Sequence, residues 1–275
     1  MADPVSKDAR PARRAPSDIP FFLALSVLGG AYVLLIAAML TADASYTPPL
    51  RLWQALGSPA IRYAVWLSLI SCSITAILSV WVAVPLGYLL SRFDFPGRAL
   101  LDVVLDLPIV LPPLVVGLSL LILFQTPPGR LVESVVPVTY AIPSVILAQF
   151  SVACTFAVRT MRVTFDQIPR RREEVAMTLG CSRGQAFWRV TLPEARRGVV
   201  AAFTLAWARA LGEFGPILVF SGATRFRTEV LSTTVFLELS VGNLEGALAV
   251  SLLMVAAAVV VLVIVQLFGA EKVLA

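Results

Sequence analysis

The chain has 275 residues, of which 58% are hydrophobic and 14% are charged; its net charge is +5 and its mean hydropathy is +0.86. Soluble domains are about 45–50% apolar and about 25% charged, so this composition argues against a water-soluble enzyme, a disordered protein and a nucleic-acid-binding protein. The sequence has no histidine, the commonest general base and metal ligand, and its three widely separated cysteines form no metal-binding or disulfide pattern.

Six apolar stretches are long enough to cross the ~30 Å hydrocarbon core of a bilayer, which takes about 20 helical residues. They lack the apolar–polar alternation of barrel strands, so the sequence predicts an all-α membrane protein with six transmembrane helices. The first stretch is too long for the apolar region of a signal peptide, and we expect an uncleaved anchor. Residues 1–18 before it are expected to form a disordered cytoplasmic tail. The predicted spans, in one domain over residues 19–270, are about 19–42, 63–91, 101–124, 141–160, 198–221 and 246–270.

Lysine and arginine are distributed unevenly among the segments that join these spans. The N-terminal tail, segments 92–100 and 159–197 and the C-terminal end hold sixteen of them, whereas segments 43–61, 125–140 and 222–244 hold four. Because cytoplasmic segments carry the excess of positive charge, both termini are predicted to lie in the cytoplasm. That orientation requires an even number of spans, and six satisfies it.

The third predicted span has a proline-rich start. Pro108, Pro112 and Pro113 lack the backbone amide that an α-helix uses, so they perturb its geometry. Irregular backbone at membrane depth is tolerated where it is buried in protein or lines a watery cavity. We therefore expect this span to face a translocation path, with an ordinary packed kink as the alternative.

The segment 161–197 is the one sizeable polar stretch on the predicted cytoplasmic side, and it is too short to build a core of its own. Pro169 suits the first turn of a helix, where its missing amide would be unpaired anyway. Residues 170–179 favour that helix, and Gly180 can take the left-handed conformation that ends it.

A second short helix is predicted over residues 183–190. Ser182 and Gln185 match a capping box, in which the serine accepts from the third amide and the glutamine reaches back. Pro193 is expected to end this helix before the fifth span begins. Two short helices without a core must pack on the rest of the chain, on the lipid surface or on a partner.

Two aromatic residues, Phe187 and Trp188, lie on the second of these helices. Aromatic residues and arginines are frequent anchors at protein interfaces, so the helix pair is interpreted as a docking site for a partner. The alternative is that this segment is a loop whose arginines bind anionic lipid headgroups.

The fifth predicted span is interrupted by charge. Arg209 and Glu213 are four residues apart and lie on one helix face. Ionisable groups within spans mostly pair or face a cavity, so we expect these two to pair with each other or across a dimer. Gly212 and Gly215 disturb the helix at the same point, and this span is also expected to face the translocation path.

The polar segment carries a spaced motif. The letters E-V-A at 174–176, Gly180 three residues later and V-T-L-P at 190–193 resemble the EAA loop of bacterial ABC importer permeases, which reads E-A-A, three residues, G, nine residues, I-x-L-P. The resemblance implies a type I importer permease fold in the inner membrane, whose coupling-helix pair inserts into a separate ATP-binding subunit. The coupling residues that it implies are Glu174, Ala176, Gly180, Phe187, Trp188, Leu192 and Pro193.

Two further stretches, L-P-I-V-L-P-P-L-V-V-G over 107–117 and A-L-G-E-F-G over 210–215, resemble the molybdate, tungstate and sulfate permeases of that family. The resemblance implies a path for an oxyanion, molybdate or tungstate before sulfate. It also implies a second permease subunit, most simply a second copy, two ATPase subunits that bind ATP and magnesium, and a periplasmic binding protein. This chain has no GxxxxGK[ST] phosphate loop, so no cofactor is expected in it. The candidate path residues are Pro112, Pro113, Arg209, Gly212, Glu213 and Gly215.

Two other readings of the sequence stay open. A permease of the same superfamily could carry phosphate, iron, a polyamine or thiamine. An ion-coupled secondary transporter would usually place carboxylates in mid-span and show an inverted repeat, but Glu213 alone lies clearly within a span and no repeat is obvious. We therefore expect a non-catalytic pore subunit.

Overall fold

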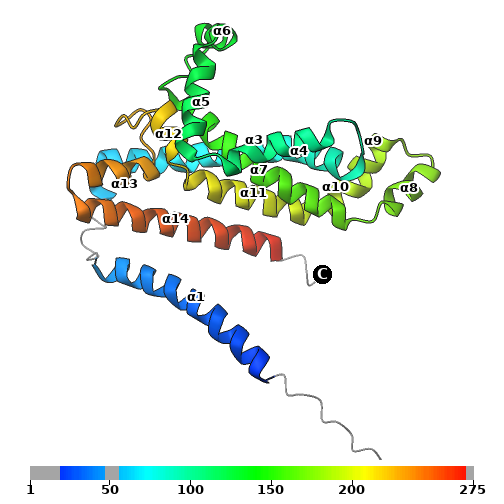
Figure 1. The fold of residues 1–275 in the computed structure, drawn as a ribbon, viewed down its shortest axis with the longest axis horizontal. Coiled ribbons are helices and arrows are strands. Elements are labelled where there is room, and N and C mark those ends of the chain that lie inside the picture. The colour runs from blue at the N-terminus through cyan, green and yellow to red at the C-terminus, as the bar shows by residue number, and fades with distance from the viewer. Residues whose placement is uncertain (1–18, 47–55, 271–275) are drawn as a thin grey trace, which may run out of the picture. The chain divides into compact units, whose positions relative to one another are not determined.

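The computed structural model describes residues 19–46 and 56–270, and throughout these ranges the regular structure is helical (Figure 1). The predicted disordered tail of residues 1–18 lies outside the described residues. The elements are α1 (Ile19–Tyr46), α3 (Pro59–Arg92), α4 (Arg98–Val110), α5 (Pro113–Gln125), α6 (Pro127–Val135), α7 (Ile142–Gln167), α8 (Arg171–Thr178), α9 (Arg183–Ala186), the π-helix η1 (Phe187–Thr191), α10 (Leu192–Glu194), α11 (Arg196–Leu211), α12 (Gly215–Phe220), α13 (Leu231–Ser240) and α14 (Leu244–Ala270).

The helix α1 forms a compact unit by itself. Its segment Phe21–Ser45 is long and apolar enough to cross a bilayer, and it overlaps the first predicted span. Large apolar side chains such as Leu28 and Leu34 are exposed along it. A helix that is apolar all round suits immersion in lipid.

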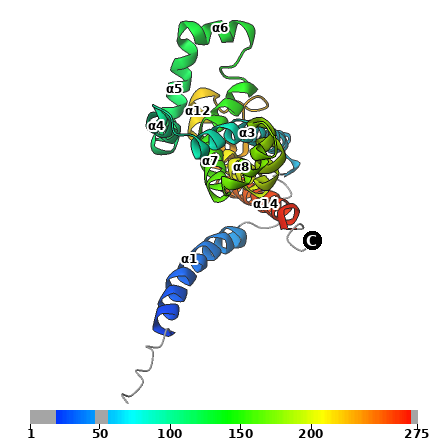
Figure 2. The same cartoon turned by 90° about the vertical axis from the view of Figure 1, so that its right-hand side faces the viewer.

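The second unit begins at Thr47, and its core is the bundle of α3, α7 and α11, which lie side by side in both views (Figures 1 and 2). Buried alanines such as Ala83, Ala157 and Ala206 line the contacts between these helices. Small residues let helix backbones approach closely, which is how helices associate where lipid is as apolar as leucine. The buried Gln149 amide joins all three helices, since it accepts from Thr75 Oγ1 at 3.2 Å and donates to the Ala210 carbonyl at 3.3 Å.

Within the described residues, four helices are long and apolar enough to cross a bilayer, and a fifth crossing is possible if one bent pair counts as a span. The predicted spans 63–91, 141–160 and 246–270 correspond to α3, α7 and α14.

The two remaining predicted spans, the ones expected to be disturbed by prolines or interrupted by charge, are not single helices. The span 101–124 is divided into α4 and α5, which meet at an angle of 114°. The span 198–221 is divided into α11 and α12 after Gly212. The physical reason is the same in both, because prolines at the start of α5 and α12 supply no amide to continue the preceding helix.

Candidate functional site

The predicted helix pair of the polar segment is present as α8 and α9. Gly180 ends the first helix with φ +91°, as expected of the left-handed conformation that glycine tolerates. The capping box begins the second helix: the Gln185 amide donates to Ser182 Oγ at 3.3 Å, and the Ser182 amide donates to Gln185 Oε1 at 2.9 Å.

The second helix differs from its prediction. After one turn of α9 it widens into the π-helix η1, in which the Leu192 amide donates to the Phe187 carbonyl five residues back. Pro193 does not end the helix, because it occupies the first turn of α10, where a proline amide is not needed. The helical path therefore continues almost to α11, which begins at Arg196.

A buried ion pair fixes the inner side of the helix pair to the end of α3. Arg92 Nε lies 2.8 Å from Glu173 Oε1, and the two side chains are 6% and 9% exposed. The hydroxyl of Tyr88 donates to the other Glu173 oxygen at 2.9 Å, and Arg92 Nη2 donates to the Ile168 carbonyl at 3.0 Å. Because a buried charge pair needs all of these partners to offset its desolvation, α8 is held in one position against α3.

Aromatic packing continues this contact along the second helix. The ring of Phe187 lies 4.6 Å from that of Tyr88 and 6.3 Å from that of Phe165, measured between centroids. Phe187 therefore faces the chain's own helices, whereas the neighbouring Trp188, whose ring centroid lies 5.5 Å from that of Phe187, is 68% exposed.

The outer side of the helix pair is apolar and exposed. Val175 is 50% exposed and Leu179 is 81% exposed, and Glu174 of the same helix is exposed as well. Exposed apolar side chains gathered on one face mark an interaction surface more than a solvated one. Of the predicted coupling residues, Glu174, Gly180, Trp188 and Pro193 are exposed, Phe187 and Leu192 are half-buried, and Ala176 is buried within the chain at 8% exposure.

The proline- and glycine-rich segments predicted to line a path meet each other. Pro112 caps α5 and Pro113 begins it, and a Cβ added to Gly215 at the start of α12 would lie 2.7 Å from Pro113 Cβ. One turn further along, a Cβ on Gly117 would lie 2.7 Å from Pro216 Cα. The two glycines thus allow the backbones of α5 and α12 to touch, as both views of the ribbon show (Figures 1 and 2).

Replacing Gly215 by alanine is expected to separate α5 from α12. The added methyl overlaps Pro113, and overpacking of this kind costs roughly 1–3 kcal/mol. Thermal unfolding of the purified protein and solute uptake should both decline. Gly29→Ala is the matched control, since a Cβ there meets nothing within 4 Å. Equal unfolding temperatures for the two variants would contradict the close contact.

The charged pair in the interrupted span forms within the chain. Arg209 Nη1 lies 2.7 Å from Glu213 Oε2, and the Glu213 side chain is 2% exposed. The guanidinium also lies 5.8 Å from the centre of the Phe156 ring, a cation–π distance. Gly212 ends α11 between the two charged residues. The sequence predicted that Arg209 and Glu213 pair either with each other or across a dimer, and the structure contains the pair within one chain.

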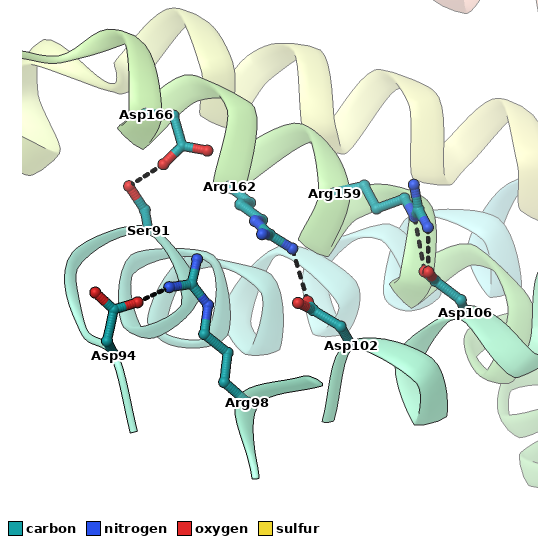
Figure 3. A network of polar contacts seen from close by, with 8 residues as sticks. All are labelled: Ser91, Asp94, Arg98, Asp102, Asp106, Arg159, Arg162 and Asp166. Carbon is teal, nitrogen blue, oxygen red and sulfur yellow. Dashed lines mark hydrogen bonds and ion pairs between the residues drawn. The ribbon is translucent and has the colours of Figure 1, made fainter. Parts of the chain in front are cut away.

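Ionic contacts join the outer arm α4 to α7 (Figure 3). Arg162 Nη1 donates to Asp102 at 2.6 Å, and Arg159 Nε donates to Asp106 at 2.7 Å. No residue of α4 is fully buried, and these charges hold it together with Leu101 and Leu105, which pack against the core. Figure 3 also shows Ser91 donating to Asp166 at 2.6 Å and Arg98 pairing with Asp94.

Sequence reasoning missed two of these features. It selected Glu174 from the motif, but the neighbouring Glu173 makes the buried ion pair. It also assigned no role to Asp102 and Asp106, which pair with Arg162 and Arg159. The four-residue spacing of Arg98, Asp102 and Asp106 is the signal that could have revealed a charged stripe along one helix face.

Comparison with known proteins places this geometry in a family. Residues 83–271 match the family model described as "Binding-protein-dependent transport system inner membrane component". The sulfate transport system permease protein CysT of Escherichia coli is 33% identical over 213 residues, which cover 76% of this chain and 77% of that protein. The molybdenum transport system permease protein ModB of Mycobacterium tuberculosis is 34% identical over 251 residues, which cover 90% of this chain and 93% of that protein.

A solved structure shares the fold. The chain resembles one from a bacterial alginate ABC transporter in complex with an alginate pentasaccharide-bound periplasmic protein, with a TM-score of 0.72 and 16% identity. The match covers 92% of this chain and 94% of the other. At this level of identity the likeness speaks for the fold alone.

Proposed function

The chain belongs to the family of binding-protein-dependent transport system inner membrane components, and on that premise we propose that it forms the import path for a tetrahedral oxyanion. It is a multi-pass inner-membrane permease and a non-catalytic component of its transporter. Membership of this family excludes the alternative of an ion-coupled secondary transporter.

Coupling to ATP hydrolysis is assigned in this proposal to the outer face of α8, α9 and η1. The observation that carries the assignment is the two-sided character of the helix pair. Its inner side is fixed to α3 by the ion pair of Glu173 and Arg92, and its outer side exposes Val175 and Leu179. A rigidly mounted apolar surface can transmit the closure of an ATPase subunit to the spanning helices, whereas a loosely attached loop would absorb it.

The proposed assembly contains two copies of the permease, two ATPase subunits that bind ATP and magnesium, and a periplasmic binding protein. We place both termini in the cytoplasm because arginine is concentrated in the segments on that side. Five of the six crossings in this proposal are α1, α3, α7, α14 and the bent pair α4–α5, which are long and apolar enough to cross a bilayer. The sixth is assigned to the broken pair α11–α12.

The translocation path is proposed to run along the broken helices. The supporting observation is that α5 and α12 meet at Pro113 and Gly215, with the ion pair of Arg209 and Glu213 next to them in sequence. A paired arginine offers no fixed high-affinity site for an anion, which suits a pore that must release its cargo. Capture is left to the binding protein.

Molybdate or tungstate is the proposed cargo, ahead of sulfate. The sulfate and molybdate permeases are nearly equal in identity to this chain, but ModB matches it over 90% of its length and CysT over 76%. Cells expressing the permease with its ATPase and binding protein should accumulate labelled molybdate, and tungstate should compete more strongly than sulfate. A system in which sulfate competes best would reverse the order, and one that carries phosphate, iron, a polyamine or thiamine instead would reject the assignment to molybdate, tungstate or sulfate.

A further inference from the structure

An apolar groove lies between α3 and the helix pair. Its cavity volume is about 590 Å³. One wall is formed by Trp81, Val84 and Leu89 of α3, and the opposite wall by Trp188 and Leu192. Trp81 and Trp188 are 76% and 68% exposed, so the groove is open along its edges.

One charged residue, Arg183, lines this groove among the residues that the structure describes. Its guanidinium lies 5.1 Å from the centre of the Phe93 ring, and no carboxylate of the described ranges pairs with it. The nearby acidic residues are engaged elsewhere, because Glu173 pairs with Arg92 and Glu194 with Arg172. The groove therefore has one positive charge available at its mouth.

The depth of the groove matches one leaflet of a bilayer. Its α3 residues run from Val80 to Leu89, and that helix ends three positions later at Arg92. At 1.5 Å per residue this wall is about 14 Å long, which is close to half of the ~30 Å hydrocarbon core. Tryptophan on both walls is typical of side chains at the membrane interface.

We propose that this groove binds an anionic phospholipid of the cytoplasmic leaflet. An acyl chain lies along the apolar wall of α3, and the phosphate is held by Arg183. Charge complementarity selects this occupant, because basic pockets beside spanning helices on the cytoplasmic side attract acidic headgroups. The leaflet assignment rests on the orientation given under the proposed function. The bound lipid would fill the space between the coupling helices and α3, so the two would move together.

Lipid retention by the full-length permease tests this proposal. The protein is stripped of lipid in detergent and incubated with dioleoylphosphatidylglycerol or dioleoylphosphatidylcholine, and bound lipid is counted by native mass spectrometry. Wild type should retain phosphatidylglycerol about five-fold better, the factor that corresponds to the ~1 kcal/mol of one basic residue at a membrane surface. Arg183→Gln should abolish this preference. Arg189→Gln is the matched control, because Arg189 is exposed on η1 but does not line the groove.

A groove-filling variant keeps the test independent of charge. A Cβ added to Gly184 meets no atom within 4 Å, so Gly184→Leu can fold without a clash and narrow the groove that it lines. It should reduce the retention of both lipids. Equal retention of the two lipids by wild type, or full preference in Arg183→Gln, would overturn the proposal. A changed oligomeric state in Gly184→Leu, without loss of lipid, would assign the groove to a second copy instead.

This measurement needs neither transport nor ATPase activity. A failure of the coupling assignment would leave lipid retention unchanged, and a failure of lipid retention would leave the coupling tests unaffected.

Discussion

Replacing Leu179 by glutamate is expected to abolish ATP-driven uptake while the permease stays folded. Leu179 is 81% exposed at the end of α8, beside Val175, which is 50% exposed. A surface substitution away from special features changes the free energy of unfolding by no more than about 0.5 kcal/mol. Inside an interface with the ATPase, however, the new carboxylate would be desolvated without a partner, at a cost of about 2 kcal/mol or more. Binding of the ATPase subunit should therefore weaken more than ten-fold.

Co-purification of the ATPase with the permease, together with uptake by cells, measures this loss. Leu179→Met is the matched control, since it keeps an apolar side chain of similar volume and should retain both properties. Thermal unfolding of the isolated permease should be the same for all three proteins. Normal co-purification with full uptake in Leu179→Glu would remove the outer face of the helix pair from the coupling interface.

Replacing Glu173 by alanine is expected to be the most destabilising single change in the helix pair. It leaves Arg92 buried, at 6% exposure, with no carboxylate partner. Breaking a buried pair from one side costs about 3–5 kcal/mol, because the remaining charge stays desolvated. Tyr88 also loses its acceptor. The unfolding temperature should fall, and amides of α8 and η1 should exchange hydrogen faster as these helices detach from α3.

The neighbouring glutamate supplies the control for this prediction. Glu174 lies on the exposed face of the same helix turn, so Glu174→Ala should leave the unfolding temperature nearly unchanged while affecting uptake. A double variant, Arg92→Met with Glu173→Met, removes both charges and should recover most of the stability. If Glu173→Ala unfolded at the wild-type temperature, the ion pair would not be what holds the helix pair in place.

The helix pair could be predicted from sequence because its signals are local. Gly180 is free to take φ +91°, and the Ser182–Gln185 capping box is complete within four residues. Hydrophobic runs likewise predict α1, α3, α7 and α14, since a membrane demands long apolar helices wherever they lie in the chain. In each case the interactions that determine the local structure lie within a single helix or at its ends.

The features that escaped prediction depend on contacts between distant parts of the chain. Nothing within the sequence E-E at 173–174 says which carboxylate turns inward, because Arg92 lies 81 residues away. Prolines indicate that a helix is disturbed, but not that α4 and α5 meet at 114°. The widened turn η1 was missed for a related reason, since Phe187 packs against Tyr88 and Phe165 from two other helices.

The attachment of α4 has a mechanical consequence. Apolar side chains that interdigitate cannot part without leaving a void, but a row of guanidinium–carboxylate contacts can separate when water solvates each group. Arg159 and Arg162 hold α4 in this second way, alongside the partly buried Leu101 and Leu105, which pack against the core. The charged contacts of α4 can therefore part more readily than the buried contacts among α3, α7 and α11. Added salt weakens partly exposed charge pairs, so it should loosen the contact of α4 with α7 before it affects the bundle of α3, α7 and α11.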